Sequence, residues 1–315
     1  ESMELISGFE PAGPEVVDAS ARPHHHAAML WFLGDMVSLA TGGWFGYENP
    51  EPLIPAEKIQ GLADGLGKTV MNTFGPDSFE NSRDIGLMLG GIGWYGTHAG
   101  SEDLAASAAD YANTLAVRIE SNVESNGKVA NGSANQAATQ GIVGQGLAWA
   151  SQIDGVDHVD LAGNVLGYLV DGLWDDDAGT FASAADASTY TITARDAGDI
   201  TGGLNAADAE LGMEIKETFA RFFNQTFNRG RLQRAERPPS RDESAEYTLS
   251  LPPAAGDEYG QAAVYNAEVE YDTDTDEWTV TDRLFDTEAA LYLANQDIWI
   301  GQWGGEFYDG RGIPG

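Results

Sequence analysis

Apolar side chains recur at helical spacing along most of this chain, and alternation of apolar with polar positions is confined to one region. Apolar residues three and four apart mark one face of a helix, whereas alternation marks a half-buried strand. The spacing predicts helices over 24–41, 56–73, 87–95, 101–123, 142–150, 161–173, 197–211, 214–233 and 287–299. The alternation predicts two strands near 263–271 and 277–282, joined by a turn at 272–276. We expect loops over 175–194 and 234–257.

The stretch from Asn131 to Glu210 organises the rest of the chain, because it holds two adjoining helices separated by a short turn. Asp154-Gly155-Val156-Asp157 has turn composition, since Gly accepts positive φ and Asp can bond its own backbone. The two helices should therefore lie antiparallel. Each glycine inside a helix costs about 1 kcal/mol relative to Ala. The glycines of this pair therefore predict close approach of one helix to another, at Gly141, Gly144, Gly146, Gly163, Gly167 and Gly172.

These patterns predict a mainly α fold built from antiparallel helix pairs. The pairs could form an α/α-toroid-like arrangement or an irregular multi-helix bundle, with a small C-terminal β-hairpin in either case. A chain of 315 residues can bury a large core. We expect a lead-in segment over 1–22, followed by a single helical domain over 23–315 with a β-hairpin insertion near 260–285.

The charge balance adds a prediction about solvent. The chain has 50 Asp and Glu against 16 Lys and Arg, a formal net charge of −34. Such a charge repels itself at low salt, but at molar salt the Debye length shrinks to about 3 Å. The sequence therefore predicts a halophilic protein. Nucleic acid is disfavoured as a partner, because no basic face is available to displace counterions from phosphates.

The absence of cysteine excludes disulfides, thiolate metal sites and a cysteine nucleophile. No apolar run is long enough for a transmembrane segment, and no signal-peptide pattern opens the chain. The chain begins at Glu1, which suggests that a leader was removed or that the chain is part of a longer polypeptide. The location that we expect is extracellular or on the cell surface.

Two parts of the chain resemble the helix-loop-helix unit of α/α-toroid proteins. The first part consists of Leu173-Trp174-Asp175, Gly179-Thr180-Phe181, Asp199 and Gly202-Gly203-Leu204-Asn205-Ala206. The second consists of Phe285-Asp286-Thr287, Leu291-Tyr292-Leu293-Ala294-Asn295-Gln296 and Ile298-Trp299. With its acidity, the chain also resembles secreted haloarchaeal proteins of unassigned function that occur beside halocyanin-type copper modules. The chain itself lacks the Cys of a blue-copper site.

Carboxylates are the first candidates for catalysis. General acid and base work on a glycoside needs two carboxyl groups in one cleft, about 5 to 10 Å apart, one with a raised pKa. The predicted loop-helix junctions, where a toroid would place its site, carry Asp175, Asp199 and Asp84. Among fifty acids, most carboxylates are simply solvated.

Two groups of residues could bind a metal. Asp272, Asp274 and Asp276 alternate like the opening of a calcium loop, although the Gly and Glu that an EF-hand requires further along are absent. A charged hairpin tip is the simpler interpretation. His24-His25-His26 could offer imidazoles to a transition metal, but at most two consecutive side chains could share one ion. Packing of one imidazole at the helix entry is the structural alternative.

Aromatic residues gather where predicted helices end, and they are candidates for ligand binding. An aromatic face can stack on a sugar or on a partner surface, but Trp is also highly buried on average. The ligand-binding candidates are Trp44, Tyr47, Trp94, Tyr95, His98 and Trp174.

The sequence supports two functional hypotheses and does not identify a cofactor. It contains no Walker loop, Gly-x-Ser-x-Gly elbow, His-Glu-x-x-His or Rossmann motif. The first hypothesis is a non-catalytic interaction or assembly domain whose partner is a protein or a glycan. The second is a carbohydrate-active α/α-toroid enzyme, a glycoside hydrolase or epimerase-like protein with paired carboxylates. A filled ring centre would favour the first hypothesis, and a cleft with close carboxylates would favour the second.

Overall fold

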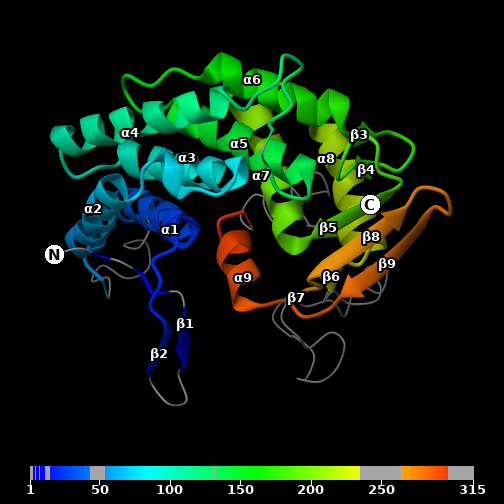
Figure 1. The fold of residues 1–315 in the computed structure, drawn as a ribbon, viewed down its shortest axis with the longest axis horizontal. Coiled ribbons are helices and arrows are strands. Elements are labelled where there is room, and N and C mark those ends of the chain that lie inside the picture. The colour runs from blue at the N-terminus through cyan, green and yellow to red at the C-terminus, as the bar shows by residue number, and fades with distance from the viewer. Residues whose placement is uncertain are drawn as a thin grey trace, which may run out of the picture.

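The chain is mainly helical, with small antiparallel sheets (Figure 1). The computed structural model describes residues 3, 5–6, 8–10, 15–42, 54–130, 132–234 and 264–296. The α-helices within these residues are α1 (Pro23–Thr41), α2 (Ala56–Thr73), α3 (Ser82–Thr97), α4 (Glu102–Glu120), α5 (Gln136–Ala150), α6 (Val159–Gly167), α7 (Ala194–Ala209), α8 (Lys216–Phe222) and α9 (Thr287–Ala294). Short 3-10 or π-helical segments lie between these helices, namely η2 (Pro76–Ser78), η3 (Tyr168–Gly172) and η4 (Phe223–Arg229).

The odd-numbered helices form an inner ring. α1 packs against α3, α3 against α5, α5 against α7, and α7 against α9. The outer helices α2, α4 and α6 each pack on the inner helix that precedes them. Asn295 Nδ2 at the end of α9 donates to the carbonyl oxygen of Ala28 in α1 at 3.2 Å, so α9 returns to the start of the ring. This arrangement is α/α-toroid-like and confirms the predicted fold class.

Glycine allows the inner helices to approach closely. A Cβ atom added to Gly203 in α7 would lie 2.4 Å from the Cα of Gly141 in α5, far inside van der Waals contact. The close approach expected at Gly141 is therefore confirmed. The same expectation is wrong for Gly163 and Gly167 in α6, where an added Cβ would meet no atom within 4 Å.

The centre of the inner ring is filled with side chains. Trp31 of α1 and Trp149 of α5 are buried and meet edge to face, with their ring centroids 4.9 Å apart. Gln145 of α5 and Gln296 after α9 are also buried, and their amides exchange two hydrogen bonds at 2.8 and 3.3 Å. No open channel therefore follows the ring axis at these residues.

The main sheet contains three antiparallel strands in the order β5 (Thr189–Thr193), β8 (Glu268–Asp272) and β9 (Glu277–Asp282). The hairpin of β8 and β9 confirms the predicted C-terminal hairpin. The sequence predicts a loop over 175–194, and this prediction is wrong for β5. Its five side chains alternate in burial, with Tyr190 and Ile192 buried opposite Tyr271 and Val269 of β8. A pattern of five residues is too short to identify a strand unless the partner strand is known.

The remaining strands form short antiparallel pairs. They are β1 (Gly8–Glu10) with β2 (Glu15–Asp18), β3 (Trp174–Asp175) with β4 (Thr180–Phe181), and β6 (Gln233–Arg234) with β7 (Val264–Tyr265). β1 and β2 lie in the predicted lead-in segment and project from the helices in Figure 1. α7 begins three residues earlier than predicted, at Ala194, because Thr193 and Asp196 form a capping box.

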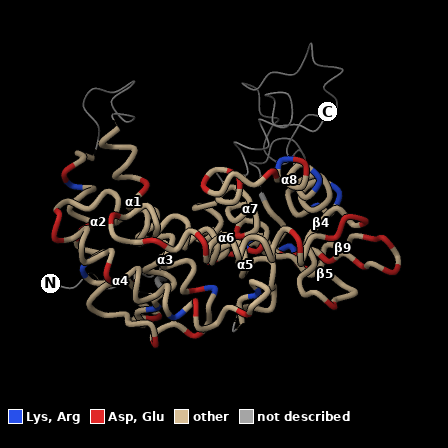
Figure 2. The backbone as a smooth tube through the Cα atoms, turned by 90° about the horizontal axis from the view of Figure 1, so that it is seen from above, with Lys and Arg blue, Asp and Glu red and all other residues tan. Residues whose placement is uncertain are grey.

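Acidic residues are distributed over helices and loops alike (Figure 2). Lys and Arg are few in the same view, as the composition requires. None of the described helices combines the length and the apolar character that crossing a membrane would require.

Candidate functional site

The first turns of α1, α3, α7 and α9 meet at one end of the ring and carry ionisable side chains. Because α2, α4 and α6 each return the chain, the inner helices α1, α3, α5 and α7 run in the same direction. Their N-terminal ends favour negative charge, and acidic residues occupy the first turns of α3, α7 and α9 as Asp84, Asp196 and Glu288. The first turn of α1 instead carries His24 and His25.

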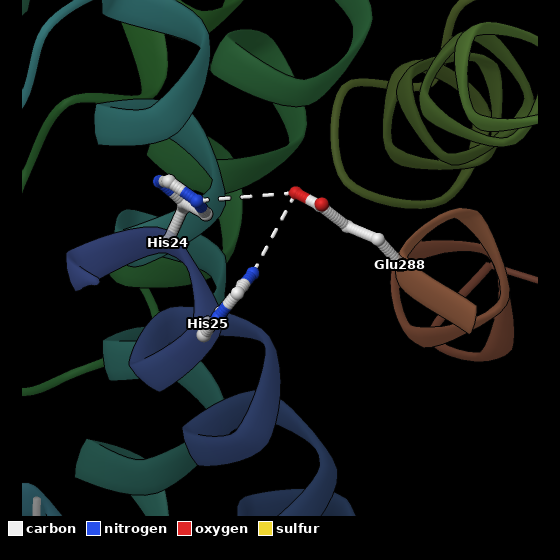
Figure 3. Close-up of side chains that lie close together, drawn as sticks. All are labelled: His24, His25 and Glu288. Carbon is white, nitrogen blue, oxygen red and sulfur yellow. Dashed lines mark ion pairs between the residues drawn. The ribbon is translucent and has the colours of Figure 1, made fainter. Parts of the chain in front are cut away.

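His24, His25 and Glu288 converge in space (Figure 3). His24 Nε2 lies 4.0 Å and His25 Nε2 3.5 Å from Glu288 Oε1, so both imidazoles face one carboxylate oxygen. The two imidazole rings meet edge to face with centroids 4.8 Å apart. These three residues, which we call the His-His-Glu group, join the first turn of α1 to the first turn of α9.

Charged and aromatic side chains hold the His-His-Glu group in place. Asp84 Oδ2 lies 3.7 Å from His24 Nδ1, the imidazole nitrogen that does not face Glu288. Arg195 Nη2 lies 3.4 Å from Asp84 Oδ1, and its guanidinium carbon lies 3.8 Å from the centre of the Tyr292 ring. The Tyr292 hydroxyl donates to Glu288 Oε1 at 3.2 Å. The group is therefore tied to α3 and α7 as well as to its own helices.

Burial and charge act in opposite directions on these groups. Burial lowers the pKa of His24, while the carboxylates of Asp84 and Glu288 oppose this shift. Burial raises the pKa of Tyr292, and the positive charge of Arg195 opposes this rise. Tyr292 therefore remains a hydrogen-bond donor at neutral pH.

Arg83 of α3 forms buried ion pairs with two carboxylates of α7 at this end of the helix ring. Its guanidinium is buried and bonds Asp199 through Nε and Nη2 at 2.8 and 2.6 Å, and Asp196 Oδ1 through Nη1 at 2.8 Å. Burial by itself would lower the pKa of Arg83, but Asp199 and Asp196 outweigh it and raise that pKa. Burial raises the pKa of Asp199, and the positive charges of Arg83 and Arg195 oppose this rise. The two short hydrogen bonds from Arg83 nevertheless hold Asp199 in an ion pair.

The third consecutive imidazole has a structural role. His26 is fully buried, its Nδ1 lies 2.7 Å from the Arg22 carbonyl oxygen, and its Nε2 accepts the Leu5 backbone N–H at 2.9 Å. Two of the three histidines share a site, and the third ties the N-terminal segment to α1. This division agrees with the limit expected from the sequence.

A cavity of about 490 Å³ opens beside the His-His-Glu group. Two members of the group, His25 and Glu288, line it. The other lining residues come from the N-terminal segment, α1 and α9, and are Leu5, Ile6, Arg22, Met29, Asp286, Thr287 and Leu291. The cavity is therefore lined by both polar and apolar side chains.

The structure brings together two of the three predicted catalytic carboxylates. Asp84 and Asp199 both approach Arg195, whose Nη2 and Nε lie 3.4 and 3.8 Å from them. Asp175 lies elsewhere, in β3. Its Oδ1 accepts backbone N–H groups of the turn that follows, and its Oδ2 accepts the Tyr190 hydroxyl at 2.6 Å.

The carboxylates predicted as a metal site are used within the β8–β9 turn. Asp272 Oδ1 accepts the backbone N–H groups of Asp274 and Thr275 at 2.9 and 3.0 Å. Asp276 has a positive φ of 54°, and its carboxylate accepts from the Tyr271 hydroxyl at 2.9 Å. Over the part of the chain that the structure describes, the His-His-Glu group is the cluster with metal-ligand spacing, and Asp272, Asp274 and Asp276 do not form one.

The predicted aromatic site is not formed as one surface. Tyr95 is 1% exposed, and its hydroxyl donates to Asp64 at 3.2 Å. Trp94 stacks on His98 and meets Trp149 edge to face, at centroid distances of 6.1 and 5.3 Å. All three candidates lie in the last turn of α3 or just after it, away from Asp84 in its first turn.

The other aromatic candidates are separate from this group. Trp174 lies in β3 and lines, with Asp175 and Tyr190, a smaller cavity of about 300 Å³, and the guanidinium carbon of Arg221 lies 5.4 Å from the centre of its ring. Trp44 and Tyr47 lie outside the described residues.

Glu288, Arg195 and Tyr292 are the residues of this site that sequence reasoning missed. The available signal was the acidic first turn that follows the cap residue Asp286. That signal places Glu288 at a helix start but does not indicate which other helix it faces.

Comparison with known proteins supports the fold. No family model and no curated protein matches the chain. Among solved structures, the crystal structure of a sugar epimerase from a ruminal bacterium superposes with a TM-score of 0.59 at 14% sequence identity. The match covers 97% of this chain and 75% of that chain. At this identity the likeness shows a shared fold.

Proposed function

We propose that this chain is a carbohydrate-active enzyme of the isomerase or epimerase type. Its substrate class would be a reducing sugar bound at the end of the ring where the inner helices begin. The observation that carries the proposal is the convergence of His24, His25 and Glu288 beside a cavity of about 490 Å³. Cavities of about 300–1,000 Å³ are typical of small-molecule sites.

The residues around the cavity suit a polyhydroxylated ligand. Asp286 and Glu288 offer acceptors for sugar hydroxyls, and Arg22 offers donors. Met29 and Leu291 supply apolar surface for the faces of a sugar ring. A few convergent polar groups in a partly apolar cavity are typical of ligand sites.

The imidazoles favour movement of a proton next to a carbonyl over glycoside hydrolysis. Hydrolysis by paired carboxylates requires one carboxylic acid that is free to donate a proton. Asp199 is committed to Arg83, Asp84 pairs with Arg195, and Glu288 accepts the Tyr292 hydroxyl. Imidazole, in contrast, serves either as an acid-base group near neutral pH or as a metal ligand. The fold shared with a sugar epimerase supports the same reaction class.

Isotope exchange tests this proposal even while the sugar is unidentified. The protein, kept in molar KCl, is incubated in D₂O with a panel of aldoses and ketoses, and deuterium at the carbon next to the carbonyl is followed by NMR. We expect exchange with at least one sugar and at least a tenfold loss with Glu288→Gln. Glu217→Gln, an exposed change on α8, is the matched control and should keep the wild-type rate.

A non-catalytic interaction domain at the cell surface is the second candidate, and the filled centre of the inner ring favours it. This candidate predicts no deuterium exchange with any sugar of the panel. It predicts instead saturable binding to a glycan or protein that Glu288→Gln leaves unchanged. Exchange that Glu288→Gln abolishes would exclude it.

A further inference from the structure

The His-His-Glu group contains the ligand set of a transition-metal site. We propose that His24, His25 and Glu288 bind one divalent ion of the zinc class, with the remaining coordination position facing the cavity beside α9. Two imidazole nitrogens and one carboxylate oxygen are ligands that Zn²⁺ accepts, and a site with three protein ligands keeps a position for water or substrate. The inference concerns binding of the ion, which does not depend on the proposed sugar chemistry.

The distances within the group are close to those that such an ion requires. Zn–N and Zn–O bonds of about 2.1 Å in a tetrahedral site place neighbouring ligand atoms about 3.4 Å apart. His25 Nε2 lies 3.5 Å and His24 Nε2 4.0 Å from Glu288 Oε1, and all three ligand atoms lie within 4.8 Å of one another. Small side-chain rotations would close the remaining gap. Figure 3 shows that both rings already point toward the carboxylate.

Neighbouring residues are placed as the outer shell of a metal site. A ligating histidine usually donates its second ring N–H to a carboxylate or carbonyl, which fixes the tautomer and the ring orientation. Asp84 Oδ2 lies 3.7 Å from His24 Nδ1, which leaves Nε2 directed at Glu288. The Tyr292 hydroxyl bonds Glu288 Oε1 and holds the carboxylate in turn. Two of the three ligands therefore have an outer partner in place.

His26, the next residue of α1, provides a comparison, because its imidazole has a structural role. His26 has backbone partners for both of its ring nitrogens. His24 and His25 instead face carboxylates from α3 and α9. The group also differs from a cluster of carboxylates alone, since nitrogen ligands favour transition metals over Ca²⁺ and Mg²⁺.

A metal ion at this position would border the cavity and could act on a ligand bound there. The cavity is lined by His25 and Glu288 on the side of the His-His-Glu group. An ion held there could polarise a carbonyl or hydroxyl oxygen of a bound sugar as a Lewis acid. This last step rests on the proposed function, whereas the metal site does not.

Metal titration tests the inference directly. Untagged protein is dialysed against a chelator in molar KCl and then titrated with Zn²⁺ by calorimetry, in the presence of millimolar Mg²⁺ to occupy oxygen-only sites. We expect one equivalent to bind. Loss of an outer-shell partner typically costs about 10–100-fold in affinity, so His24→Ala and Glu288→Gln should each cost at least that much. His158→Ala and Glu217→Gln, which lie outside the group, should bind Zn²⁺ like the wild type.

A second measurement on the wild-type protein covers the case in which a variant does not fold. Cu²⁺ bound at one equivalent should show nitrogen hyperfine splitting in its EPR spectrum, and His158→Ala should show the same splitting. An oxygen-only spectrum, or equal Zn²⁺ affinity of wild type and His24→Ala, would overturn the inference. Zn²⁺ binding without any sugar exchange would leave the metal site standing and overturn the proposed function alone.

Discussion

Arg83 Nε and Nη2 both donate to one carboxylate oxygen of Asp199, at 2.8 and 2.6 Å, and this buried ion pair joins α3 to α7. Removing one partner of a buried pair leaves an uncompensated charge, which costs about 3–5 kcal/mol. We therefore expect Arg83→Met to lower the free energy of unfolding by that amount. Denaturant unfolding in molar KCl measures it. Arg118→Met, at an exposed position of α4, should change stability by less than about 0.5 kcal/mol.

Two glycines of the inner and outer helices should respond to alanine with opposite signs. A Cβ at Gly203 would meet the Gly141 backbone at 2.4 Å, and overpacking of this kind costs about 1–3 kcal/mol. At Gly163 no atom lies within 4 Å of an added Cβ. Alanine there should therefore raise the free energy of unfolding by up to about 1 kcal/mol through helix propensity. Unfolding midpoints of the two variants measure the difference. Equal destabilisation by both would show that the α5–α7 contact is looser than described.

Local signals predict most of the helices, and they place only some of the side chains that meet at the candidate site. α2 begins and ends where its periodicity and Pro55 place it, and the β8–β9 hairpin was visible from alternation. Asp84 and Asp199 are candidates because they lie near predicted helix starts, and the structure places both near Arg195.

The rest of the site depends on contacts between distant segments. Glu288 faces His25 only because α9 returns to α1, and no local pattern encodes that return. The same limit explains β5, whose alternation becomes a strand signal only when β8 lies beside it. The carboxylate of Asp272, predicted as a metal ligand, accepts two backbone N–H groups of its own turn, a use that the sequence pattern alone does not reveal.

Trp94 should behave as a packing residue. Its ring meets Trp149 and His98 at the opposite end of α3 from Asp84. Truncation of a packed Trp costs about 3 kcal/mol or more, so Trp94→Ala should lower stability by about that amount. Zn²⁺ affinity of the folded fraction should stay unchanged, as calorimetry can show. Weaker Zn²⁺ binding with unchanged stability would instead connect Trp94 to the site.

Asp35 gives a prediction about pH. Burial in α1 raises the pKa of this carboxyl, and His98 opposes the shift. A raised pKa in the folded state means that ionised Asp35 destabilises the fold at neutral pH, while below the ordinary value of 3.8 the group is protonated in both states. Asp35→Asn should therefore stabilise the protein at pH 7, and the gain should shrink toward pH 3.8. Asp110→Asn, at an exposed position of α4, is the control and should show no such trend.

Salt should control the stability of the whole chain. With a net charge of −34, like charges on the surface repel one another across distances that depend on screening. The Debye length falls from about 10 Å at 0.1 M salt to about 3 Å at 1 M. We expect the melting temperature to rise steeply between about 0.1 and 2 M KCl. Sucrose strengthens burial without screening charge, so it should raise the melting temperature much less at the same osmolality. A melting temperature that is the same at both KCl concentrations would mean that charge repulsion does not limit stability, and the proposal that the protein is halophilic would fail.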